Sequence, residues 1–308
     1  MVEYRRLREK HSILELCKTP ELAAQVTMQP IDRFDLDAAI IFADILLPLE
    51  PMGLSLEFAE GEGPIIHNPV RDRAAVDRLK VMDDGGLQYV MDAISLTRKT
   101  LAGRVPLIGF AGAPFTLASY AIEGGSSRNY IHTKQMMYGE PEVWHRLMDT
   151  FARVITGYLR RQIKAGAQAV QLFDSWVGCL SAGDYAEYVM PHVQLIFDGL
   201  KHEGVPLIHF GTGTTAILKS MRQAGGDVIG IDWRIPLDEA WAMVGHDRAV
   251  QGNLDPVALF APMPEIERRV ADILRRAGGR PGHIFNLGHG ILPNTPVEHV
   301  AATIDLVH

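Results

Sequence analysis

Hydrophobic residues along this chain form two kinds of run. Long stretches with apolar residues at helical spacing are followed by short apolar runs, and each short run ends in a glycine-rich or polar turn. The long stretches predict helices at 74–101, 141–165, 182–202, 215–223, 237–244 and 263–277. The short runs predict strands at 38–42, 105–110, 169–173, 205–210, 227–231, 248–252 and 283–286. This alternation of helix and strand predicts a parallel sheet with right-handed crossovers.

The chain length of 308 residues matches a (β/α)8 barrel. A closed barrel needs eight strands and the pattern supplies seven. Because every interval after the first strand is filled, we expect the missing strand to precede residue 1. Residues 1–34, predicted to be helical with a break at Thr19-Pro20, would then be the crossover from it. The sequence therefore predicts an α/β fold, a (β/α)8 TIM-type barrel lacking its first strand in this chain, with residues 1–308 as a single barrel domain.

One carboxylate, Asp44, follows the first apolar run. The length and β-branched content of residues 38–42 predict a strand buried on both faces. Asp44 would then lie at the carboxyl end of a parallel strand, where ligands bind in such folds. The alternative is that Asp44 only caps the following helix. Residues 47–72, rich in Pro and Gly, are too long for an ordinary connection, so we expect a functional excursion with a hairpin arm at 54–58.

Composition narrows the possible functions. The net charge of −7, without a cluster of Lys and Arg, argues against nucleic-acid binding. No apolar run is long enough to span a membrane, and the charged N-terminal residues lack the core of a signal peptide. Cys17 and Cys179 form neither a disulfide framework nor a zinc motif. A cytoplasmic protein that does not act at membranes is expected.

The turns after other predicted strands carry further candidate groups. Tyr120 lies in a helix that Thr116 can start, after a turn of small residues. Ser175 follows the strand at 169–173, and His289 lies between two glycines after the last strand. No metal-binding signature accompanies them. The glycine- and threonine-rich turn at 211–215 is a weak candidate for binding a phosphate at a helix N-terminus.

At these positions the chain resembles the uroporphyrinogen decarboxylase family. The resemblance extends from Glu3 to the C-terminus, and its most specific part is GFAGAPFTLASYAIEG at 109–124. Other motifs follow in the family's order: CKTPELAAQVTMQP (17–30), FADIL (42–46), GIDWRIP (230–236), QGNLDP (251–256) and NLGHGILP (286–293). Any one of these motifs would be weak evidence, but the ordered set is strong.

The resemblance implies an enzyme of porphyrin and heme biosynthesis, a barrel that is usually a homodimer. It would remove carbon dioxide from the four acetate side chains of uroporphyrinogen III, giving coproporphyrinogen III, with no metal or organic cofactor. Matching by motif, Asp44 would accept hydrogen bonds from the four pyrrole N–H groups and act in catalysis with Tyr120. Tyr120, Ser175 and His289 would contact the substrate, and Arg8 matches an arginine that helps to hold it.

The chain departs from the family pattern at its N-terminus. The family's Arg-Gln-Ala-Gly-Arg motif, followed by Tyr-Leu-Pro, belongs just before Glu3 and is absent here. The same lost segment would account for the missing strand, and a chain that truly lacked it would be weak or inactive. An inactive tetrapyrrole-binding paralogue is therefore one alternative function. Another is a zinc- and cobamide-dependent methyltransferase on the same barrel, which the positions of Cys17 and Cys179 disfavour.

Overall fold

The computed structural model describes residues 1–59, 63–81 and 86–308. Within these ranges, seven parallel strands form one sheet in the order β1-β4-β5-β6-β7-β8-β9, and β2 pairs with β3 in a separate hairpin. The strands are β1 (Ala39–Ile40), β2 (Leu56–Ala59), β3 (Gly63–Ile66), β4 (Leu107–Gly112), β5 (Ala169–Asp174), β6 (Leu207–Gly211), β7 (Val228–Gly230), β8 (Ala249–Gln251) and β9 (His283–Ile284). All seven strands predicted for the barrel are present, in the predicted order.

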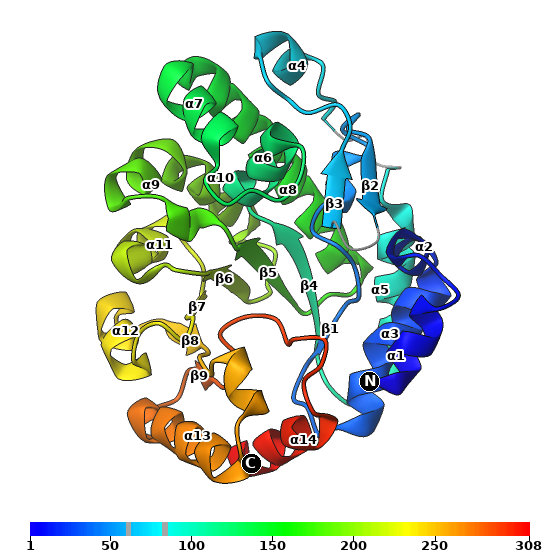
Figure 1. Cartoon of the computed structure of the whole chain (residues 1–308), viewed down its shortest axis with the longest axis vertical. Helices are drawn as coiled ribbons and strands as arrows, with labels where there is room; N and C mark the ends of the chain where they lie inside the picture. The colour runs from blue at the N-terminus through cyan, green and yellow to red at the C-terminus, as the bar shows by residue number, and fades with distance from the viewer. Residues whose placement is uncertain (60–62, 82–85) are drawn as a thin grey trace.

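Helices connect the strands and form a ring outside the sheet (Figure 1). The α-helices of the described ranges are α1 (Val2–Arg8), α2 (Ile13–Lys18), α3 (Pro20–Arg33), α4 (Arg73–Asp77), α5 (Gln88–Leu101), α6 (Pro114–Glu123), α7 (Ile131–Gly139), α8 (Pro141–Ala165), α9 (Ala182–Tyr188), α10 (Met190–Leu200), α11 (Leu218–Ala224), α12 (Leu237–Val244), α13 (Met263–Ala277) and α14 (Val297–Val307). Short 3-10 helices are η1 (Leu47–Leu49), η2 (Val177–Cys179), η3 (Thr215–Ile217) and η4 (Pro256–Phe260). In this described part of the chain, none of the helices has the length and apolarity needed to cross a bilayer.

Three helices, α8, α12 and α13, have the bounds that the hydrophobic pattern predicts. The three other predicted helices are each divided in two, and that at 215–223 consists of η3 followed by α11. The region 74–101 contains α4 and α5, and residues 82–85 between them lie outside the described part. The region 182–202 is divided at Val189, where the backbone leaves the helical conformation between α9 and α10.

The N-terminal region breaks at Thr19 as predicted, but a second break precedes Ser12. Ser12 begins α2 through a capping box, because its hydroxyl accepts a hydrogen bond from the backbone of Glu15 while the Glu15 carboxylate accepts one from Ser12. Helix α1 ends at Arg8, before the capping box, whereas apolar spacing alone predicts a continuous helix up to Thr19. This region is therefore three helices instead of two.

The sheet curves into most of a barrel (Figure 1). Gln251 Nε2 on β8 donates a hydrogen bond to Gln171 Oε1 on β5 at 3.2 Å. Two strands, β6 and β7, lie between β5 and β8 in the sheet, so this contact requires strong curvature. The structure thus confirms the predicted α/β class with a barrel-like parallel sheet.

The barrel is open between β1 and β9, which are the two ends of the strand order in the described ranges. Side chains approach across this gap. Arg5 of α1 donates to the carbonyl oxygen of Pro293 at 3.1 Å, and the His308 ring lies 3.4 Å from the Asp37 carboxylate. A hollow of about 220 Å³, lined largely by apolar side chains from α14 and residues 285–287, adjoins the gap. The gap occupies the place that a strand preceding β1 would take.

β1 differs from the predicted strand in length and burial. The pattern predicts a strand over residues 38–42 buried on both faces, but β1 has two residues and Ile40 is 44% exposed. β1 pairs only with β4, so its other side faces the gap. The prediction of buried faces was wrong because it assumed a strand in the interior of the sheet.

The predicted hairpin arm is confirmed, since β2 and β3 are antiparallel partners. The backbone after the hairpin is tied to the end of α6: Ile66 N–H donates to the carbonyl of Gly124, and Val70 N–H donates to that of Ala121, both at 2.8 Å. Arg71 also donates to the carbonyl of Ile122 at 2.6 Å. The excursion therefore lies against the helix that carries Tyr120.

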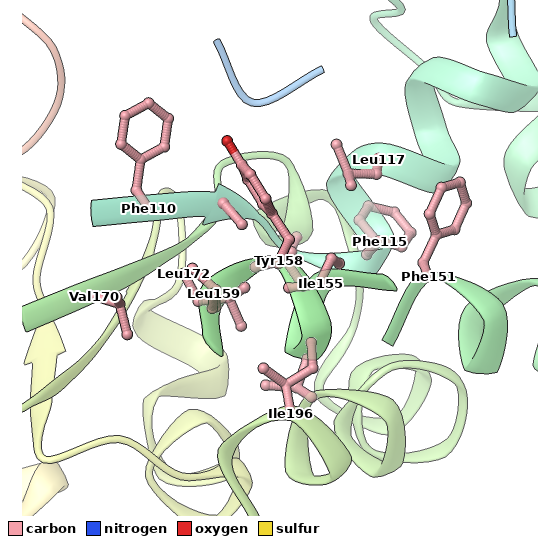
Figure 2. Close-up of a cluster of buried hydrophobic side chains, with 14 of the residues drawn as sticks. Phe110, Phe115, Leu117, Phe151, Ile155, Tyr158, Leu159, Val170, Leu172 and Ile196 are labelled. Atoms are coloured by element: carbon pink, nitrogen blue, oxygen red, sulfur yellow. The ribbon is translucent and has the colours of Figure 1, made fainter. Parts of the chain in front are cut away.

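The core between the sheet and the helix ring is apolar, with one polar tie. Figure 2 shows Ile155 and Leu159 of α8 beside Leu172 of β5, while Phe110 of β4 projects from the opposite side of the sheet. Gln162 of α8 is fully buried, and its side-chain amide exchanges hydrogen bonds with the backbone N–H and carbonyl of Phe110 at 2.8 and 2.7 Å. Because buried amides require partners, this pair fixes α8 against β4.

Candidate active site

A row of aromatic rings crosses the inner side of the sheet. The rings of Phe110 on β4 and Phe173 on β5 are 5.4 Å apart between centroids, and those of Phe173 and Phe210 on β6 are 5.6 Å apart, in edge-to-face arrangements. The His289 ring continues the row, 6.4 Å from Phe210. These rings form an apolar surface near the carboxyl ends of the strands.

Asp44 lies four residues beyond the end of β1, in the turn that leads to η1. Its Oδ1 accepts a hydrogen bond from the backbone N–H of Leu46 at 2.8 Å. The residue that caps η1 is Leu46, so Asp44 stabilises the turn without being the cap itself. Burial raises the pKa of the Asp44 carboxyl, and the bond from Leu46 opposes that shift. The carboxyl group is therefore held in a partly water-excluded position.

Tyr120 lies on α6 and contacts the turn that contains Ser175. The segment of Asp44 also approaches this helix, because Leu117 of α6 and Ile45 both lie within 3.2 Å of a Cβ added at Gly112. Its ring packs edge-to-face against Trp176, with centroids 6.2 Å apart. Burial raises the pKa of the Tyr120 phenol, and the charge of the nearby Asp44 raises it further. Ser175 precedes Trp176 directly, at the carboxyl end of β5. The structure thus brings the candidate residues Asp44, Tyr120 and Ser175 to one side of the aromatic row.

His289 lies at the other end of the row, on an exposed loop after β9. Its neighbour Gly288 is close to the strand-end turn of β7: a Cβ added there would lie 2.7 Å from the backbone nitrogen of Trp233. A Cβ added at Gly290 would meet nothing within 4 Å. Only the first of the two glycines is therefore required for close packing of the loop that carries His289.

Arg8 is the last residue of α1 and is exposed. Its guanidinium donates to the carbonyl oxygen of His11 at 2.8 Å. The Tyr4 ring, one helical turn before Arg8, packs edge-to-face against that of Phe42, with centroids 5.9 Å apart. Helix α1 therefore lies beside the segment that leads to Asp44. The hydrogen bond of Arg8 holds the helix end and does not join Arg8 to the other candidates.

Thr116 does not start α6 as predicted. The helix begins at Pro114, which makes Thr116 its third residue. The Thr116 hydroxyl donates to Asp174 Oδ1 at 3.1 Å and accepts from the backbone N–H of Trp176 at 3.4 Å. Asp174 is fully buried at the end of β5. The sequence analysis selected Ser175 after this strand and gave Asp174 no role, so the contact between Asp174 and Thr116 was missed.

Asp174 makes the stability of the fold dependent on pH. Burial raises the pKa of its carboxyl from the ordinary 3.8 to about 7. Between these values the folded protein binds more protons than the unfolded one, so stability is greatest below the lower value and falls until the pH passes about 7. We expect the difference in melting temperature between Asp174→Asn and the wild type to be several degrees more favourable to the variant at pH 8 than at pH 5. An equal change in melting temperature at both pH values would contradict the raised pKa of the Asp174 carboxyl.

The weak phosphate-binding candidate of the sequence finds no support as a ligand site. In the turn at 211–215, the Gly213 N–H already donates to the carboxylate of Asp232, so it is not free for a phosphate. Asp232 also pairs with Arg234, whose guanidinium stacks on the Trp233 ring at 4.1 Å from its centroid. In the described ranges no group of three or more His, Cys, Asp or Glu residues is arranged to hold a metal ion.

The whole chain, residues 1–308, matches the family model described as Uroporphyrinogen decarboxylase (URO-D). The chain belongs to the uroporphyrinogen decarboxylase family. A uroporphyrinogen decarboxylase from Sorangium cellulosum is 62% identical over 309 residues, which cover 100% of this chain and 88% of the relative. One from Carboxydothermus hydrogenoformans is 57% identical, with the same coverage of both chains. These matches confirm the predicted family, a family of carboxy-lyases in porphyrin and heme biosynthesis.

Solved structures agree with the barrel fold. A methyltransferase from Methanosarcina mazei superposes with a TM-score of 0.81 at 19% identity, covering 95% of this chain and 86% of that one. A B12-independent methionine synthase from Shewanella sp. W3-18-1 gives a TM-score of 0.61 at 11% identity, covering 94% and 85%. At these identities the likeness concerns the fold alone. The methyltransferase alternative therefore gains nothing from it, and the decarboxylase family match stands against it.

Proposed function

We propose that this protein removes carbon dioxide from the four acetate side chains of uroporphyrinogen III to give coproporphyrinogen III. Membership of the family supports the reaction. The observation that carries the proposal for the site is the position of Asp44, a partly buried carboxylate just beyond the carboxyl end of β1, the strand that pairs with β4 and hence lies next to the start of the aromatic row. A porphyrinogen has saturated bridging carbons that let the macrocycle dome, so its four N–H donors can point at one carboxylate while the aromatic rings contact the macrocycle.

The chemistry of pyrrole acetates explains how one carboxylate can promote the decarboxylation. Loss of carbon dioxide from an acetate on an electron-rich pyrrole follows protonation of the ring, which then takes up the electron pair of the broken bond. Asp44 would stabilise the positive charge of the protonated ring more than the neutral substrate, which is the condition for raising the rate. Each charge-assisted hydrogen bond from a pyrrole N–H contributes roughly 1.5–3 kcal/mol.

The other candidates would act at the periphery of the substrate. Tyr120 is proposed to contact the reacting pyrrole. Ser175, which follows the strand that carries Phe173, and His289, at the end of the aromatic row, are proposed to bind side-chain carboxylates. Arg8 uses one guanidinium nitrogen, Nη1, in its bond to His11, and its other N–H groups are proposed to bind a carboxylate of the substrate. We further propose a single-domain homodimer in the cytosol, as the family resemblance implies.

The test is direct. Purified protein is incubated with uroporphyrinogen III under reducing, oxygen-free conditions, and carbon dioxide and porphyrinogen products are measured. The proposal predicts four molecules of carbon dioxide and one of coproporphyrinogen per substrate. Tight binding of the porphyrinogen with no carbon dioxide release would instead support the tetrapyrrole-binding paralogue.

The two glycines that flank His289 offer a matched pair of variants. Gly288→Ala places a methyl group against the backbone of Trp233 and shifts the loop, so we expect decarboxylation to slow by about tenfold, because small misplacements of binding groups are costly. Gly290→Ala meets open space and should leave the rate within about twofold, since surface substitutions without clashes have small effects. Equal rates for the two variants would argue against a role for the position of His289.

A further inference from the structure

Asp174 and Thr116 lie between two of the candidate substrate contacts. Thr116 is four residues before Tyr120 on α6, and Asp174 directly precedes Ser175 at the end of β5. The Thr116 hydroxyl joins the two elements, because it donates to Asp174 Oδ1 at 3.1 Å and accepts from the N–H of Trp176 at 3.4 Å. We propose that Asp174 is a positioning residue that, through Thr116, fixes Tyr120 and Ser175 relative to each other. The inference rests on the proposed function of this site.

The burial of Asp174 is the first argument. Its side chain is fully buried, and Oδ2 has no hydrogen-bond partner among the described residues. A buried carboxyl group without a cationic partner is unfavourable, and an apolar residue of similar size would fold better at this position. Polar groups that are kept at such a cost are concentrated at functional sites. The bond from Thr116 is therefore the feature that requires explanation.

The second argument is that the residues bonded to Thr116 also contact Tyr120 and the turn after β5. Trp176, whose backbone bonds to Thr116, packs its ring against Tyr120 at 6.2 Å. A further backbone bond, from Ala113 N–H to the carbonyl of Phe173 at 2.8 Å, ties the start of α6 to the same strand end. The Thr116 hydroxyl thus links α6, which carries Tyr120, to the turn after β5, which carries Ser175. Losing the hydroxyl would let the β5 turn and α6 move apart while the backbone bond keeps the fold.

The surroundings offer no other anchor for the carboxyl. The titratable groups whose pKa values respond to its charge are Tyr185 on α9 and Cys179 on η2, and neither supplies a positive charge. The Lys134 ammonium on α7 donates to the carbonyl oxygen of Cys179 at 2.9 Å. Among the described residues the Tyr185 hydroxyl is itself buried without a partner. Thr116 is therefore the one recorded hydrogen-bond partner of the carboxyl within those ranges.

Three substitutions on α6 separate positioning from stability. Thr116→Val removes the hydroxyl and keeps the side-chain shape, and Thr116→Ser keeps the hydroxyl. Ser119→Ala is the matched control, since the buried Ser119 hydroxyl donates only to the carbonyl of Phe115 on the same helix. We expect Thr116→Val to lower kcat with uroporphyrinogen III about tenfold, Thr116→Ser to restore it within about threefold, and Ser119→Ala to leave it unchanged despite a similar loss of melting temperature. Equal kcat for Thr116→Val and Ser119→Ala would overturn the proposal.

A double-mutant cycle tests whether Asp174 acts through Thr116. Asp174→Ala and Thr116→Val should each lower kcat, and the double variant should lose no more than the larger single loss, because both remove one contact. Additive losses would contradict the proposal. If Asp174→Ala does not fold, the comparison of Thr116→Val with Thr116→Ser still decides. Wild-type protein that releases no carbon dioxide would refute the proposed function of the site, whereas active wild type with unaffected variants would refute only the positioning role.

Discussion

Asp44→Asn will lower kcat for decarboxylation of uroporphyrinogen III by about 10³-fold, with a change in KM of about threefold or less. The amide keeps an oxygen that can accept the bond from Leu46, so the turn after β1 should persist. What it loses is the negative charge that would face the protonated pyrrole. Because that charge favours the transition state over the neutral substrate, the loss falls on kcat and much less on binding.

The control for this variant lies in the same segment. Asp37→Asn removes a carboxylate from an exposed position before β1, and its rate should match the wild type. Steady-state rates with saturating uroporphyrinogen and a separate binding titration measure the two quantities. An unchanged kcat in Asp44→Asn would remove Asp44 from the mechanism.

Gly178→Ala will destabilise the fold by about 3 kcal/mol, the upper range for inserting atoms into a packed site. Gly178 lies in η2, just after the Ser175 turn, and a Cβ there would lie 2.1 Å from the carbonyl oxygen of Thr212 and 2.8 Å from Cα of Gly213. Both contacts are with backbone, which cannot move aside as a side chain can. Urea or thermal unfolding followed by circular dichroism measures the loss.

Gly157→Ala in α8 is the matched control. Nothing lies within 4 Å of a Cβ added at Gly157, and alanine favours helix over glycine by up to about 1 kcal/mol. This variant should therefore be slightly more stable than the wild type. A Gly178→Ala variant as stable as Gly157→Ala would mean that the turns after β5 and β6 do not pack as closely as the structure indicates.

The order of the strands could be predicted from the sequence because each strand is a short apolar run bounded by Gly, Pro or polar residues. Helices whose ends are marked locally, such as α8 between Pro141 and Gly166, were predicted to the residue. The break at Val189 also has a local mark, Pro191 in the first turn of α10, but the prediction over 182–202 followed the apolar spacing and did not use it. The exposure of Ile40 also escaped prediction, because it depends on which strand lies beside β1 and not on the residues of β1.

In the candidate site, too, some features follow from local sequence and others depend on contacts between distant residues. Asp44, Tyr120, Ser175 and His289 could be selected because parallel strands end at one side of a sheet, so groups that follow them in sequence gather there. The bond between Thr116 and Asp174 joins residues 58 positions apart and depends on the first turn of α6, so one sequence does not reveal it. Arg8 was selected by motif, and its bond to His11 depends on how α1 ends.

The hydrogen bond between the Gln171 and Gln251 side chains limits the routes by which substrate and product can reach and leave the site. These side chains meet across the interior and are each 5% exposed, so the barrel is plugged beneath the aromatic rings. Passage through the interior between the two ends of β5–β8 is therefore closed, and a porphyrinogen and its product share the carboxyl ends of the strands and the gap between β1 and β9 as their route. Because substrate and product use one route, product that accumulates competes with the next substrate for the site.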